Sequence, residues 1–525
     1  MWVSVDSTAF QYNFCSLLAA KSSIMRQRFE QQMSLRTVAI SDVKFPLKSR
    51  DELPPVLMAL QYIFVTPGLN EKVFELLEKK ICKGKKKTGR KGMDLWHILV
   101  LAVVRHACGT NWDTLETWAN HHELVRRVMG VHATAFIEDE KIDPIAIGFN
   151  YQTILDNVSL IDEDLLWQIN LLVIDAGHKL LKKKEDEALK LKTDSYAVET
   201  DVHFPTDLNL LWDSCRKCLD MIKKLQDISA GSLGGWRKIK RIYKTLKSQF
   251  RATSQKVFKG RDEHQKKQFV REYLRQAKRL ESKVEEVIKN PPVVMDKEVM
   301  VMAVIAQLVK YKNYVTKFTD QIERRLLKGE TILAEEKIFS IFEEHTEWLT
   351  KGKLNKKVEL GLLLLVTTDQ YQFIVDYKLL EKQRDAAQVS GLCERIKKHY
   401  PGKEIGSHSF DKGFWSKDNL ATLQGAGIAQ VVLPKKGRHN KEDKERESGI
   451  EFKKLRNAHS AVESNINMLE HHGLNRCMDK GLHGFKRYAG LSVLAYNLHI
   501  PGNALKAKAR AEEERREKLR LKVAA

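Results

Sequence analysis

A long helical stretch separates two regions of strand-forming sequence in this chain of 525 residues. The first strand signal covers residues 189–198 and ends before Pro205, because proline has no N–H to donate within a central strand. From 208 to 354 apolar residues recur at helical spacing, and strand-forming sequence returns at 360–366 as a continuous apolar run. This pattern predicts an α/β fold in which a helical insertion follows the first strand.

The remainder of the strand-forming region alternates between strands and helices. Further strands are predicted at 372–377 and 430–433, and a helix is predicted at 387–399. The lysine-rich stretch 435–447 is predicted to be a hydrophilic loop. A single helical stripe then follows, and a last helix packs through residues 488–498. The stripe consists of Leu455, Ala458, Val462, Ile466 and Leu469.

Three acidic residues far apart in the sequence could share one site. Asp194 lies within the first strand, Asp411 follows the run IGSHSF, and Glu463 lies at the edge of the helical stripe. Phosphodiester cleavage by metal-activated water needs clustered oxygen ligands, which are the ligands Mg²⁺ prefers. Asp201 and Asp207 compete with Asp194 for the first position, although Asp207 is better placed to cap the first inserted helix.

The segments around these acids resemble bacterial insertion-sequence transposases of the DDE type, specifically the ISNCY type. The segments are KTDSYAVETDVHFPTDLNLL, SHSFDKGFWSKDNL and NAHSAVESNINMLEHHGLNRCMDKGLHGFKRYAGLSVLAYNLH, and the likeness covers roughly residues 40 to 505. It implies a ribonuclease-H-like mixed-sheet catalytic core, interrupted by a large all-helical insertion and preceded by a helical N-terminal DNA-binding domain. Asp194, Asp411 and Glu463 would be the catalytic acids and the metal ligands.

The resemblance also implies an activity. The enzyme would cleave DNA at the ends of an insertion sequence and transfer the strands into target DNA, with two Mg²⁺ ions as cofactors and Mn²⁺ as a substitute. Its partners would be double-stranded DNA, both terminal inverted repeats and target, and a second or further copies of the chain bound to that DNA. It would reside in the bacterial cytoplasm with the nucleoid. The alternative is a catalytically inactive, domesticated DNA-binding protein derived from a transposase, and a further rival is a nuclease without strand transfer.

These inferences divide the chain into six parts. They are a leader whose natural start could be Met25 or Met33 (1–50), a helix-turn-helix-like DNA-binding domain (51–135), a helical connector (136–187), the catalytic core (188–207 and 355–503), the helical insertion (208–354) and a basic tail (504–525).

The charge balance favours a polyanionic partner. Ninety Lys and Arg residues against 68 Asp and Glu residues give a net charge of +22, and phosphate neutralisation drives the binding of such proteins to nucleic acid. For each basic group the alternative to DNA binding is a role on a solvated surface. For each tryptophan the alternative to base stacking is a structural place in the core or on the surface. The candidate DNA contacts are Lys85, Lys86, Lys87 and Arg90 in a glycine-punctuated loop, Lys238 and Arg241 on one helix face, Lys412 and Arg456 near the acids, and Trp236 or Trp348 as a base-stacking ring.

Three further features bear on class. Helical spacing at 95–103 and a capping box from Thr110 to Asp113 indicate helix, turn and helix, which is either a DNA reader or an ordinary hairpin. Cys215 and Cys218 fall on one apolar helix face and are predicted to be buried rather than metal-bound. No apolar run approaches the ~18 residues of a membrane span, so no membrane partner is expected.

Overall fold

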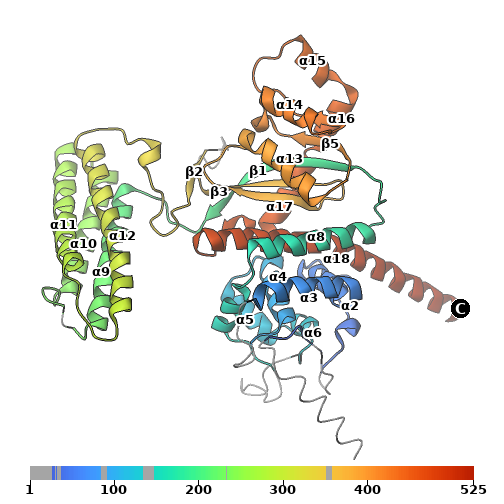
Figure 1. Cartoon of the computed structure of the whole chain (residues 1–525), viewed down its shortest axis with the longest axis horizontal. Helices are drawn as coiled ribbons and strands as arrows, with labels where there is room; N and C mark the ends of the chain where they lie inside the picture. Colours follow the sequence, from blue (N-terminus) through green and yellow to red (C-terminus); the bar gives the residue numbers. More distant parts are fainter. Residues whose placement is uncertain are drawn as a thin grey trace, which may run out of the picture. The chain divides into compact units, whose positions relative to one another are not determined.

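The computed structural model describes residues 26–29, 31, 37–83, 92–133, 147–231, 233–350 and 358–524. The chain divides into two compact units, one formed by Met1–Asp201 with Leu362–Ala525 and the other by Val202–Gly361. The fold is α/β with a seven-stranded mixed sheet (Figure 1).

The sheet is built around β1 (Leu189–Thr200). On one side β1 pairs in parallel with β5 (Ile405–Phe410), which pairs in parallel with β6 (Gln430–Val432). On the other side lies β3 (Glu359–Thr368), which is antiparallel to β4 (Ile374–Leu380). Strands β1, β3, β4 and β6 confirm the sequence-based predictions to within a few residues. The sequence did not indicate two short strands. They are β7 (Arg476–Cys477), which pairs in parallel with the last residues of β1, and β2 (Glu347–Leu349), which pairs with the first residues of β3.

Helices cover both faces of the sheet, which explains why its central strands are apolar. Leu189 and Leu191 of β1 share a core with α13 (Val389–His399) and α14 (Lys417–Gly425). Tyr196 and Val198 point to the other face and share a core with α17 (Ala461–Leu469) and α18 (Gly481–Ala524). A strand buried on both sides reads as a continuous hydrophobic run, as β3 does.

The N-terminal helices do not form a separate domain. They enclose α4 (Leu95–Ala107), all of whose residues are buried. Their core also contains Leu491, Leu494 and Leu498 of α18. The predicted boundaries at 135 and 187 therefore do not separate hydrophobic cores, because the C-terminal helix completes the N-terminal one. The elements are η1 (Ile40–Asp42), α2 (Leu53–Val65), α3 (Pro67–Ile81), α4 (Leu95–Ala107), α5 (Trp112–His121), α6 (Glu123–Met129), α7 (Tyr151–Val158) and α8 (Glu163–Leu180).

Several local predictions were wrong. The cap of α5 is Asn111, whose side chain accepts from Thr114 N, rather than Thr110. The predicted loop at 435–447 contains α15 (Lys441–Ser448), which a capping box at Asn440 initiates. The predicted single stripe is two helices, α16 (Ile450–Ala458) and α17, with a break at His459 and Ser460.

The last helix runs through the predicted tail to Ala524 and includes Pro501. It lies so close to α2 that a Cβ at Gly502 would approach Pro55 O to 1.9 Å. Only glycine permits this contact, so Gly502 sets how closely α18 packs on the N-terminal helices.

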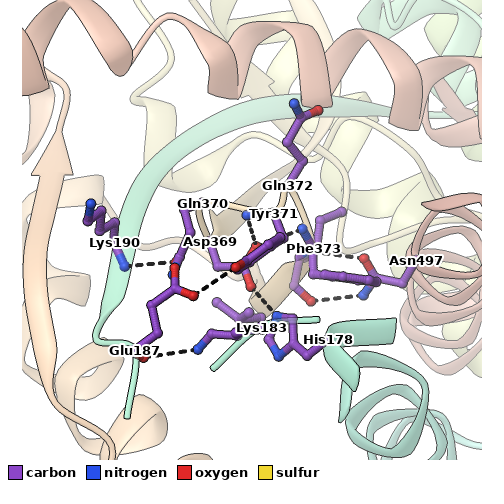
Figure 2. A network of polar contacts seen from close by, with 12 residues as sticks. His178, Lys183, Glu187, Lys190, Asp369, Gln370, Tyr371, Gln372, Phe373 and Asn497 are labelled. Carbon is purple, nitrogen blue, oxygen red and sulfur yellow. Dashed lines mark hydrogen bonds and ion pairs between the residues drawn. The ribbon is translucent and has the colours of Figure 1, made fainter. Parts of the chain in front are cut away.

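A polar network ties the β3–β4 turn to α8 and to the start of β1 (Figure 2). Asp369 is fully buried, accepts from the backbone N–H groups of Tyr371 and Phe373, and pairs with His178 Nε2 at 2.5 Å. Gln370 and Tyr371 both donate to Glu187. Because these bonds join segments about 190 residues apart, they fix the hairpin against the central strand.

The second unit is a bundle of four helices joined by short connections. They are α9 (Asp207–Ile228), α10 (Ile239–Lys259), α11 (Glu263–Lys289) and α12 (Glu298–Ile322). Cys215 and Cys218 lie in its core, as predicted. The predicted helical content ends earlier than 354, because η3 (Glu323–Leu327) and η4 (Ala334–Glu336) are followed by β2.

Candidate active site

Asp194 and Asp411 are neighbours on adjacent parallel strands. Thr193 of β1 pairs in register with Phe410 of β5, and each acid is the next residue along its strand. Because side chains alternate along a strand, both acids leave the same face of the sheet, about 5 Å apart at the backbone. Asp411 is exposed and Asp194 is half-buried. The structure thus brings together two residues that are more than 200 positions apart in the sequence.

Glu463 lies on the helix that covers this face. Val462 and Leu469 of α17 are buried in the same core as Tyr196 and Val198 of β1, which holds the helix across the strand. Glu463 follows Val462 directly and is exposed. The third acid therefore lies over the same face as the first two.

His459 anchors the start of this helix beside Asp411. Its Nδ1 lies 2.9 Å from Ser409 Oγ, and Ser409 pairs in register with Lys192. Burial lowers the pKa of His459 to about 4, although the nearby Asp411 carboxylate opposes this shift. The imidazole is therefore neutral at pH 7, and it fixes the break between α16 and α17 on the acid-bearing face.

On the opposite face, a buried row of hydrogen bonds keeps the two acid-bearing strands in register. Thr193 Oγ1 lies 2.7 Å from Thr367 Oγ1 and 2.7 Å from His408 Nε2, so the row crosses β3, β1 and β5. Burial lowers the pKa of His408 to about 3, which keeps this bonding partner neutral. The row lies one residue before Asp194, where a slip in register would separate the acids.

The predicted cluster of three ligands is formed only in part. Within the described ranges, no three His, Cys, Asp or Glu side chains lie close enough together to hold a metal ion. Asp194 and Asp411 are adjacent, but Glu463 does not complete a coordination sphere with them. The reason is that His459 is bound to Ser409 just before α17 and Val462 is buried in the core, which leaves the next residue, Glu463, on the exposed side of the helix.

The two competing acids have other roles. Asp201 lies 3.7 Å from Arg476 and 3.5 Å from Lys480, near the end of β1. Asp207 is the first residue of α9 and pairs with Arg325 at 2.7 Å, while Thr206 provides the side-chain cap. Asp194 remains the candidate on the first strand.

A further acid near this pair, Asp385, was not predicted from the sequence. It begins η5 (Asp385–Gln388), between β4 and α13, and faces η6 (Lys412–Phe414). A Cβ at Gly413 would lie 3.4 Å from Asp385 Oδ2 and 3.9 Å from Asp411 Oδ2, so two carboxylates approach the same point. Asp385 Oδ1 is buried and has no hydrogen-bond partner in the described part of the chain. In the sequence, only its position between a predicted strand and the next predicted helix could have indicated that Asp385 belongs to the site.

Two exposed basic residues flank the acids. Lys412 follows Asp411, and the carbonyl of Arg456 accepts from His459 N, one turn before α17. Neither side chain makes an ion pair with the residues that the structure describes. Both are accessible to a phosphate on this face.

A strongly basic helix lies in the second unit. Helix α10 carries seven Lys and Arg residues and no Asp or Glu, and none of the seven forms an ion pair within the described sequence. Arg241 and the preceding Lys238 are exposed. This face has the charge that nucleic acid requires.

The other DNA candidates fare differently. Trp236 is 3% exposed in the bundle core, so it is not available to stack on a base. Trp348 is 39% exposed, with its ring 5.6 Å from those of Phe204 and Phe339. The loop residues Lys85, Lys86, Lys87 and Arg90 lie outside the described residues.

The predicted DNA-reading helices do not suit that role. Helix α4 is buried on all sides, so it cannot lie on a DNA backbone. Helix α5 carries Asp113 and Glu116 and no lysine or arginine. These properties favour the alternative, an ordinary helical hairpin, over a helix-turn-helix reader.

The chain matches no family model, no curated protein and no solved structure. Among the described helices, none combines the length and apolar character needed to cross a lipid bilayer.

Proposed function

We propose that this chain is a DDE transposase that cleaves DNA at the ends of an insertion sequence and transfers strands into target DNA. The observation that carries the proposal is that Asp194 and Asp411 each directly follow one residue of the in-register pair Thr193–Phe410 on adjacent parallel strands. Glu463 on the helix across the same face adds to it. The element order of strand, helical insertion, strands, helix, strand and helix supports a ribonuclease-H-like core.

The residues on this face of the sheet fit a magnesium ion. Mg²⁺ is commonly bound by one or two carboxylates, with water and substrate phosphate completing the octahedron. Asp194 and Asp411 supply two such carboxylates, and the Asp385 carboxylate lies near Asp411 beside Gly413. When bound, Mg²⁺ or Mn²⁺ would activate water and polarise the phosphodiester. Glu463 would have to move inward to join this pair.

The other residues would position the DNA. Lys412 and Arg456 are exposed beside the acids and suit contacts to phosphate oxygens. His459 stays neutral at pH 7 and holds α17 to β5 through Ser409, so the third acid keeps its place over the sheet. The basic face of α10 would bind the DNA backbone without reading its sequence.

A cleavage and joining assay tests the proposal. Labelled duplex DNA carrying the sequences that flank the gene is incubated with the full chain and Mg²⁺, and the products are compared for wild type, Asp194→Ala and the matched control Glu404→Gln. Glu404 is an exposed acid at the opposite end of the same strand pair. We expect nicked and joined products from wild type and Glu404→Gln only. Equal cutting by Asp194→Ala would remove Asp194 from the site.

One observation favours a second candidate, a catalytically inactive DNA-binding protein. No group of three metal-ligating side chains is assembled within the part of the chain described, while the basic helix α10 is intact. Such a protein would bind the flanking DNA but would not cut it, whichever divalent metal is supplied. A nuclease without strand transfer would give cut products and no joined ones.

A further inference from the structure

Exposed apolar side chains gather at one end of the helical bundle, where α11 passes into α12. Val293, Met295 and Val299 are 89, 84 and 85% exposed, and Met300 and Met302 are 56 and 57% exposed. Single exposed apolar residues are ordinary, whereas a contiguous apolar patch on a protein surface marks a site of interaction. We call these five residues the apolar tip.

The first half of the helix that continues from the tip is mostly apolar on its exposed side as well, apart from Gln307. Residues 299–309 read VMVMAVIAQLV and contain no charge. Val301, Ile305 and Leu308 point into the bundle, whereas Met302 and Ala306 continue the exposed face of Val299. A helix without a polar face is expected to be covered on both sides. The small Ala306 allows another helix to approach closely.

The charges within the tip indicate what covers it. Asp296, Lys297 and Glu298 lie between its two halves, are exposed, and form no ion pair among the described residues. In a two-fold contact each Lys297 would pair with an acid of the other copy, which gives two ion pairs across the contact and leaves one acid of each copy unpaired. A nucleic acid would instead require a surplus of lysine and arginine, which the tip lacks.

We infer that the apolar tip is a two-fold contact between two copies of this chain. The tip lies at the end of the bundle opposite Asp207 and Ile322, where the chain enters α9 and leaves α12. Methionine side chains adapt their shape, which suits a surface that must pack against itself. The inference does not depend on the proposed enzymatic activity.

The test measures the mass of the full chain in solution, without DNA and at high salt, by sedimentation over a range of concentrations. We expect wild type to form dimers. The double variant Val299→Lys/Met302→Lys should weaken dimerisation by about a hundredfold, because it buries four lysines in the contact. Both positions are exposed, so the fold should persist, which circular dichroism checks. The matched control is Gln268→Lys, exposed at the far end of α11, which should dimerise like wild type.

A charge exchange tests the two-fold arrangement, at low salt. Lys297→Glu and the double variant Asp296→Lys/Glu298→Lys should each dimerise less than wild type, and an equal mixture should restore dimers. A wild-type chain that is monomeric at every concentration would overturn the inference, since the tip would then be covered by another part of the chain or by a different protein. Unchanged dimers in Val299→Lys/Met302→Lys, or a mixture that stays monomeric, would also overturn it.

Discussion

Neutralising Asp411 should abolish the stabilisation of the first unit by Mg²⁺ while slightly stabilising the metal-free protein. Asp194 and Asp411 are both acidic and lie on neighbouring strands. Like charges opposite each other on neighbouring strands destabilise a sheet by up to about 1 kcal/mol, and Asp411→Asn relieves that repulsion. A metal present at a hundred times its dissociation constant adds about 2.7 kcal/mol to the free energy of unfolding.

These free energies convert into a shift of the melting temperature. A folding unit of about 350 residues has an unfolding entropy of about 0.7 kcal/mol/K, so saturating Mg²⁺ should raise the Tm of the wild-type unit by about 4 °C. By the same conversion, Asp411→Asn should raise the metal-free Tm by about 1 °C and show no response to Mg²⁺. Differential scanning calorimetry with and without Mg²⁺ measures both effects.

The matched control is Glu404→Gln, which removes an exposed carboxylate from the other end of the β1–β5 pair. It should retain the full response to Mg²⁺. If Asp411→Asn keeps the wild-type shift, or if wild type shows none, the two neighbouring acids do not hold the metal and the proposed site is wrong.

Three further outcomes are expected. Asp479→Ala should lower the free energy of unfolding in urea by about 3–5 kcal/mol, because it leaves the buried guanidinium of Arg105 without the carboxylate 2.8 Å away. His399 accepts a hydrogen bond from the indole of Trp167, and burial lowers its pKa to about 4. The unfolded imidazole protonates at higher pH, so stability present above about pH 6.5 should fall as the pH drops towards 4, and His399→Gln should lose less stability between pH 7 and 5. Lys244→Gln on α10 should reduce the salt dependence of DNA binding by about one phosphate contact, whereas Lys244→Arg should not. If a variant behaves like wild type in its measurement, the contact or charge from which that prediction was made does not have the proposed role.

The secondary structure of the sheet could be predicted because burial on two faces leaves a local signature. The apolar run of β3 and the alternating signals around β1 appear within a few residues of sequence. The break at His459 and the helix α15 were missed for the opposite reason. The first depends on a contact with Ser409, fifty residues away, and the second has no apolar stripe to reveal it.

The site could be predicted only as a set of separate motifs. The residues around Asp194 do not indicate that Asp411 will lie beside it. The register of β1 and β5 depends on the hydrogen bond between Thr193 and His408, which are 215 positions apart. Asp385 was missed because its approach to Asp411 exists only once η5 and η6 are packed together. The same limit applies to Trp236, since its sequence context suits a surface ring as well as a core ring, and the bundle buries it.

By itself, the sequence determined the kind of most of the longer elements, the positive charge, and the order in which those strands and helices follow one another, because these depend on the spacing and type of neighbouring residues. The tertiary structure alone decided which acids meet, which basic face stays without ionic partners, and which apolar helix face is left uncovered. Those properties arise from contacts between segments hundreds of residues apart, and short-range patterns carry no record of them.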